Sequence, residues 1–179
     1  VDDAFVGERR WPAGAAGPRA ADIKIAAVRI LDRTGAVSAY LDRRHPFTVE
    51  IEYDLAQPCT SMQVGFFVTN AAGVLVFVAG DAENERYRGT TRPAGRWVSR
   101  ATVPGALLNT GAYTLSVAAD APVGHTVMVE QQVLRFYIEQ TGIPINVNLV
   151  QQGLIDAVSQ LPGHITVPGA MGVRGAGPV

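Results

Sequence analysis

Hydrophobic and polar residues alternate along much of the chain, as they do in strands that bury one face. The clearest stretch is 47–55, where Phe47, Val49, Ile51, Tyr53 and Leu55 alternate with polar residues. Comparable stretches are separated by turn residues such as glycine, proline and asparagine. The pattern predicts strands at 23–31, 47–55, 62–70, 74–78, 95–103, 113–118 and 126–138. Their number and spacing favour an all-β, immunoglobulin-like antiparallel sandwich.

In two of the predicted strands, the apolar residues switch from odd-numbered to even-numbered positions, or the reverse, partway along the strand. Ile23 and Ile25 share one face, whereas Val28 and Ile30 continue on the opposite parity. The last long strand slips in the same way near Gln131. An extra residue in one strand of a pair produces such a slip, so we predict a β-bulge in each.

The stretch 104–120 contains a turn followed by a strand. Gly111 precedes Tyr113, and Tyr113, Leu115 and Val117 then alternate with smaller residues. A tyrosine at this place in an immunoglobulin-like sandwich ties the corner together through its hydroxyl. We therefore expect the Tyr113 side chain to hold the turn that precedes its own strand.

The chain divides into three parts. Residues 1–21 form a linker or arm in which Phe5 and Trp11 either dock onto the domain or a partner, or remain disordered. Residues 22–139 form the sandwich, and 140–179 form a C-terminal extension. The extension has a helical pattern at 151–161 and a possible edge strand at 164–167. It either folds back on its own domain or crosses to a second copy, which would give a swapped dimer.

Charge and cysteine content exclude several classes of protein. The 179 residues have a formal net charge of -1 without a run of like charge, so a nucleic-acid partner is not expected. Cys59 is the single cysteine, which excludes an intrachain disulfide and favours a cytoplasmic location. No apolar run approaches the ~20 residues of a membrane span, and no signal peptide is visible. Because the chain begins without Met, we expect it to be part of a larger protein.

Catalytic and cofactor motifs are missing from the sequence. There is no phosphate-binding loop, no dinucleotide-binding loop and no paired-cysteine or zinc-protease motif. The histidines, His45, His125 and His164, lack metal-ligand spacing. Glu50 and Glu52 share a strand face about 7 Å apart, but nothing separates their pKa values, so we interpret them as a solvated acidic face. We expect no enzyme activity, no cofactor and no metal in this domain.

The most informative surface is the outer side of two strands. Gln63, Phe67 and Thr69 lie on one strand, and Thr114 and Ser116 lie on the other. These strands are neighbours in an immunoglobulin arrangement, so their side chains would form one patch of hydroxyls, amides and one ring. Such a surface suits a sugar that stacks on the ring. The alternative is that the extension or a second subunit covers the patch.

A long polar connection at 80–93 follows the fourth predicted strand. Loops of this length in a compact domain tend to be functional or disordered. Asn84, Tyr87 and Arg88 lie in it and could close over a ligand on the sheet face. Arg86 or Arg88 would also suit an anionic group.

Four segments together resemble the Wzt-type C-terminal domain of ABC transporter ATPases that export O-antigen polysaccharide. They are Leu31–Gly35, Phe47–Tyr53, Val64–Val68 and Leu107–Val117, with Leu-Asn-x-Gly-x-Tyr at Leu108–Tyr113 as the best motif. The resemblance covers about residues 22–138. It implies a noncatalytic carbohydrate-binding sandwich, usually a homodimer, that recognises a lipid-linked glycan. It further implies an ATPase domain before residue 1, a membrane permease as partner and a location at the cytoplasmic face of the inner membrane.

The ending of the chain departs from this resemblance. The Gly172-Val173-Arg174 segment lacks the proline- and tryptophan-containing finish associated with the family. A second function class therefore stays open, in which the domain is a structural or adaptor sandwich whose outer face binds a protein partner or its own dimer mate.

Overall fold

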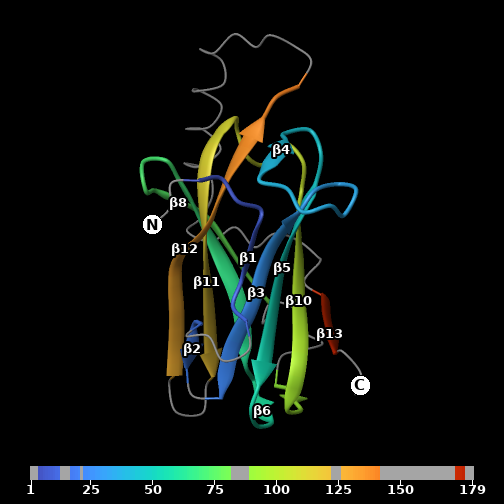
Figure 1. The fold of residues 1–179 in the computed structure, drawn as a ribbon, viewed down its shortest axis with the longest axis vertical. Coiled ribbons are helices and arrows are strands. Elements are labelled where there is room, and N and C mark those ends of the chain that lie inside the picture. Colours follow the sequence, from blue (N-terminus) through green and yellow to red (C-terminus); the bar gives the residue numbers. More distant parts are fainter. Residues whose placement is uncertain are drawn as a thin grey trace.

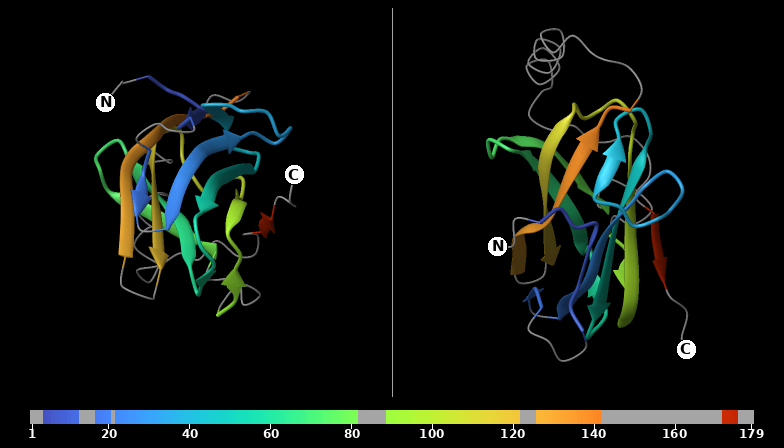
Figure 2. Two further views of the ribbon diagram at one scale, coloured as in Figure 1. Left: turned by 60° about the horizontal axis from the view of Figure 1, so that its bottom comes forward. Right: turned by 45° about the horizontal axis from the view of Figure 1, so that its top comes forward.

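The computed structural model describes residues 4–12, 17–20, 22–81, 89–121, 126–141 and 172–175. Their strands form two facing layers (Figures 1 and 2). In sheet A the order is β1-β3-β5-β10-β13, with β2 paired to β3, and in sheet B it is β4-β12-β11-β7-β8. The all-β sandwich predicted from the alternation is confirmed.

The strands of sheet A are β1 (Glu8–Arg10), β2 (Arg19–Ala20), β3 (Ile23–Leu31), β5 (Phe47–Leu55), β10 (Gly95–Val103) and β13 (Gly172–Gly175). Those of sheet B are β4 (Tyr40–Asp42), β7 (Gln63–Asn70), β8 (Leu75–Gly80), β11 (Gly111–Ala121) and β12 (Thr126–Glu139). A short pair, β6 (Cys59–Thr60) and β9 (Thr91–Arg92), lies beside them. All pairs are antiparallel except β12 with β4, which is parallel.

The hydrophobic core lies between the two sheets. The five alternating apolar residues of β5 are all buried, as the sequence predicted. From sheet B, Phe66, Leu115 and Phe136 face them with at most 1% of each side chain exposed. In chain order β3, β5 and β10 belong to one sheet and β7, β11 and β12 to the other, which is the immunoglobulin arrangement.

The corner before β11 has the predicted geometry. The Tyr113 hydroxyl donates a hydrogen bond of 3.0 Å to the carbonyl oxygen of Asn109. The Tyr113 ring also stacks on Phe136, with centroids 5.6 Å apart. Burial raises the pKa of Tyr113, so its hydroxyl stays protonated and remains a donor well above neutral pH.

We expect Tyr113→Phe to lower the free energy of unfolding by about 1 kcal/mol, because it removes this hydrogen bond and keeps the ring. Urea unfolding followed by tryptophan fluorescence measures the change. A variant as stable as the wild type would show that the hydroxyl does not hold the corner.

Both predicted bulges are present. The register between β3 and β5 shifts between Ile25 and Ala27, where the parity of the sequence changes. The register between β11 and β12 shifts between Leu115 and Val117, opposite Gln132, which has a φ of 53°. Each bulge keeps apolar side chains on the core face on both sides of the extra residues.

The described part of the N-terminal arm docks onto the sandwich. β1 pairs with β3, and Trp11 packs against the core. The Val6 amide donates to the carbonyl oxygen of Arg135 in sheet B, and the Ile30 amide of sheet A donates to the carbonyl oxygen of Gly7. The arm therefore crosses from one sheet to the other along one edge of the sandwich.

The end of the chain adds a strand. β13 pairs antiparallel with β10, so Gly172–Gly175 forms the outer strand of sheet A (Figure 1). The glycine-rich end predicted no strand there. The predicted helix at 151–161 and edge strand at 164–167 lie outside the described residues. In the described part of the chain there is no helix long and apolar enough to cross a membrane.

Candidate functional site

The outer faces of β7 and β11 form one surface, because the two strands are neighbours. Phe67 lies directly opposite Ser116, and Thr69 lies opposite Thr114. Gln63 pairs with Asp120 near one end of the same ladder. The predicted adjacency of the two strands is thus confirmed.

The predicted residues on this surface, which we call the β7–β11 face, differ in exposure. Gln63 is exposed, whereas Phe67, Thr69 and Thr114 are half-buried. Ser116 is only 3% exposed, and its Oγ accepts a hydrogen bond of 2.9 Å from the Gln132 amide. The Ser116 hydroxyl therefore supports the bulge of β12 beneath the surface.

Small residues keep this face shallow. Ala118 lies opposite Gly65, which in turn pairs with Gly80 of β8. A Cβ on Gly65 would lie 2.5 Å from the carbonyl oxygen of Ala79, so no side chain fits there without moving the neighbouring strand. Val78 and Val129, which are 39% and 48% exposed, border the small residues on either side.

The loop residues Asn84, Tyr87 and Arg88 lie outside the described residues. Asp81 and Arg92, which come before and after these residues in the chain, form a buried ion pair. Arg92 Nη1 lies 2.8 Å from Asp81 Oδ2, and the two side chains are 2% and 0% exposed. Asp81 also accepts hydrogen bonds from the Val64 amide (2.8 Å) and from Ser99 Oγ (3.2 Å). Asp81 is thereby connected to β7 and β10 as well as to Arg92.

An aromatic group at the far end of sheet B was not predicted from the sequence. Tyr40 of β4 lies beside Tyr137 of β12, and the Phe5 ring contacts both. The guanidinium of Arg135 lies 5.2 Å from the centroid of Phe5. The alternation of side chains along β12 places Arg135 and Tyr137 on the outer face. No local sequence pattern, however, predicts that Phe5 and Tyr40 contact them.

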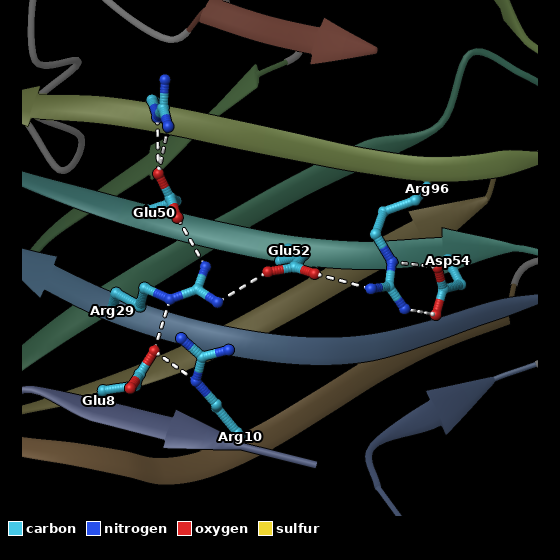
Figure 3. Close-up of polar contacts among 8 residues, drawn as sticks. Glu8, Arg10, Arg29, Glu50, Glu52, Asp54 and Arg96 are labelled. Atoms are coloured by element: carbon cyan, nitrogen blue, oxygen red, sulfur yellow. Dashed lines mark hydrogen bonds and ion pairs between the residues drawn. The ribbon is translucent and has the colours of Figure 1, made fainter. Parts of the chain in front are cut away.

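The outer face of sheet A is occupied by its own ion pairs (Figure 3). Arg29 lies between three carboxylates, Glu8, Glu50 and Glu52, at 2.5, 2.6 and 2.8 Å. Burial lowers the pKa of Arg29, but hydrogen bonds with the carboxylates, Glu52 first, outweigh burial and raise it. Arg100 and Arg96 pair with Glu50 and Glu52 on the other side.

The interpretation of Glu50 and Glu52 as a solvated acidic face is therefore wrong for Glu50, which is 6% exposed and paired with arginines from both neighbouring strands. The two carboxylates pair with arginines from neighbouring strands. These arginines come close only when the strands pair, so the sequence of β5 alone does not predict them. Because Arg29, Glu50 and Glu52 pair with one another, the centre of this face has little capacity left for a charged ligand.

A shallow depression near one end of the sandwich is lined by His45, Phe47 and Leu108, among others. It encloses no space for even a water-sized group, whereas ligand pockets usually have volumes of about 300–1,000 Å³. In the described ranges, no group of three or more His, Cys, Asp or Glu side chains is arranged to hold a metal ion. The open face of sheet B is the stronger candidate.

Comparison with known proteins identifies a matching protein family. The family model described as the Wzt C-terminal domain matches residues 19–156. A crystal structure of the C-terminal domain of Wzt superposes with a TM-score of 0.60 at 14% identity, covering 79% of this chain and 88% of that one. The CARDB domain of the PF1109 protein from Pyrococcus furiosus covers 74% of this chain and 93% of its own at 11% identity, but its TM-score of 0.35 is too low to indicate a shared fold. No curated protein matches the sequence significantly.

Proposed function

Because the chain belongs to the Wzt C-terminal domain family, we propose that it is a noncatalytic carbohydrate-binding domain that recognises an O-antigen or related polysaccharide for export by an ABC transporter. In this proposal the domain works as a homodimer next to the membrane permease, at the cytoplasmic face of the inner membrane. The ATPase activity belongs to another part of the full-length protein.

The observation that carries the proposal is the contrast between the two outer faces. On the outer face of sheet A, Arg29, Glu50 and Glu52 pair with one another, whereas the β7–β11 face presents one ring, two hydroxyls and an amide over a shallow floor. An aromatic ring beside hydroxyl and amide groups matches a sugar, which has one apolar face and a rim of hydroxyls.

Each predicted residue has a role in the proposed site. Phe67 is the stacking platform, and Gln63, Thr69 and Thr114 contact sugar hydroxyls. Ser116 supports the bulge under the platform through the hydrogen bond that its Oγ accepts from the Gln132 amide. Asn84, Tyr87 and Arg88 remain predicted contacts from the loop.

We expect Phe67→Ala to weaken binding of the polysaccharide about tenfold, because ring stacking contributes about 0.5–1.5 kcal/mol in addition to the buried area. Titration calorimetry with O-polysaccharide purified from the source organism measures the change. The double variant Thr69→Ala and Thr114→Ala tests the hydroxyls, with Thr102→Ala as its control. Thr102 is an exposed threonine on the outer face of sheet A.

Unchanged affinity in Phe67→Ala would overturn the sheet-face site. If the same variant instead shifts the sedimentation coefficient toward the monomer, the face is a subunit interface, and the adaptor class of function replaces glycan binding. Circular dichroism melting of each variant separates these results from a loss of fold.

A further inference from the structure

The aromatic group at the far end of sheet B is unusually exposed for a set of packed rings. Tyr40 has 53% of its surface exposed, although its ring centroid lies 5.7 Å from Phe5 and 6.5 Å from Tyr137. Phe5 meets Tyr137 edge-on at 5.9 Å. Soluble proteins seldom leave clustered aromatic rings open to water unless the surface binds something.

Three separate segments of backbone hold these rings in place. The Tyr137 amide donates to the carbonyl oxygen of Ala39, and the Val6 amide donates to that of Arg135. Ser38 Oγ donates to the carbonyl oxygen of Tyr40 at 2.6 Å. A Cβ on Gly7 would lie 2.6 Å from the backbone of Ser38, so the arm passes close to the β4 segment. The rings are therefore positioned before any ligand arrives.

The aromatic group is continuous with the β7–β11 face. Thr69, Thr114 and Arg135 form one row across β7, β11 and β12. Tyr137 is the next outward residue along β12, and it pairs with Tyr40. Phe67 and Ser116 lie on the other side of the same row. One surface thus has an aromatic platform at each end and hydroxyl groups between them.

From this arrangement we propose that Phe5, Tyr40 and Tyr137 form a second sugar-stacking subsite, so that the domain binds an extended segment of the glycan chain. The inference rests on the proposed function. Tyrosine rings with polar neighbours favour a sugar over an apolar protein partner, and this group is bordered by Arg135 and by Thr114, which pairs with Arg135. The exposed aliphatic side chains of sheet B lie away from the rings: Leu75 and Val78 are on β8 at the opposite edge of the sheet, and Val129 lies toward the other end of β12.

The separation of the two platforms sets the length of the ligand. Ala112, which pairs with Tyr137, and Ser116, which pairs with Phe67, are four residues apart on β11. Four residues of strand span ~13 Å, and the three strand spacings from β7 to β4 add ~14 Å across the sheet, so the platforms lie ~20 Å apart. A single sugar ring cannot reach both, but a chain of several can.

Calorimetry with two probes tests the subsite. The probes are the intact O-polysaccharide and a fraction of one or two sugars prepared from it by mild acid hydrolysis. We expect Tyr40→Ala to weaken binding of the polysaccharide about threefold to tenfold and to leave the short fraction unchanged. Phe67→Ala should weaken both probes. Tyr40→Phe, which keeps the ring, should retain the affinity for the polysaccharide.

Val74→Ala is the control, because Val74 is also 53% exposed but lies in the loop between β7 and β8. If Tyr40→Ala binds the polysaccharide as the wild type does while Phe67→Ala does not, the second subsite is wrong and the proposed function stands. If the wild type binds neither probe, the proposed function itself fails. A change in sedimentation caused by Tyr40→Ala, without a change in glycan affinity, would overturn the subsite in favour of a protein contact.

Discussion

Replacing Asp81 with alanine is expected to lower the free energy of unfolding by about 3–5 kcal/mol, because it leaves the Arg92 guanidinium buried without its carboxylate. Asp81 and Arg92 are 0% and 2% exposed, so water cannot substitute for the lost partner. The substitution also removes the acceptor of the Val64 amide at the start of β7. Urea unfolding followed by tryptophan fluorescence measures the loss.

The electrostatic surroundings strengthen this expectation. Arg92 also donates to the Tyr53 hydroxyl at 2.8 Å, and burial raises the pKa of Tyr53 to about 12. Tyr53 is therefore neutral at pH 7 and offers no negative charge that could replace Asp81. Burial raises the pKa of Asp81 as well, while the charge of Arg92 opposes that rise.

Asp54→Ala is the matched control, since Asp54 also pairs with an arginine, Arg96, at 2.8 Å. Both partners are exposed in that pair, at 39% and 53%, and surface pairs contribute about 0–1 kcal/mol. Similar losses for the two variants would contradict the role assigned to the buried pair.

Gly65→Ala is expected to destabilise the domain by about 1–3 kcal/mol, whereas Gly80→Ala should be neutral or slightly stabilising. The two glycines lie directly opposite each other in the ladder between β7 and β8. A Cβ on Gly65 meets the carbonyl oxygen of Ala79 at 2.5 Å, but a Cβ on Gly80 meets nothing within 4 Å. Thermal melting of both variants makes the comparison.

The same pair of variants reports on the proposed site. Relief of the contact at Gly65 requires β8 to move, and β8 contains Val78, the neighbour of Phe67. We therefore expect Gly65→Ala to weaken glycan binding as well, and Gly80→Ala to leave it unchanged. Equal stability of the two variants would show that the close approach to Ala79 does not constrain the sheet.

Local sequence was sufficient for much of the fold. The period-two alternation of β5 decided which side chains face the core, because each strand residue points away from its neighbours whatever the rest of the chain does. The parity changes at Ile25 and Gln131 located both bulges for the same reason. The turn before Tyr113 predicted that its hydroxyl holds the corner, and the partner in the structure, the carbonyl oxygen of Asn109, is only four residues away.

Part of the candidate site could be predicted from the sequence. Alternation placed Phe67, Thr69 and Thr114 on outer faces, and the immunoglobulin order made β7 and β11 neighbours. The burial of Ser116 depends on the bulge in β12, so its hydrogen bond to Gln132 could not be read from β11 alone.

Only the tertiary structure decided which distant residues meet. The sequence by itself determined the seven long strands, their buried faces, the corner and the bulges, since these follow from backbone geometry over a few residues. The ion pair of Asp81 with Arg92, the arginines around Glu50, the pairing of β13 with β10 and the contact of Phe5 with Tyr40 join segments far apart in the chain. Their partners are set by strand order and by the path of the arm, and no local pattern of hydrophobic and polar residues encodes either.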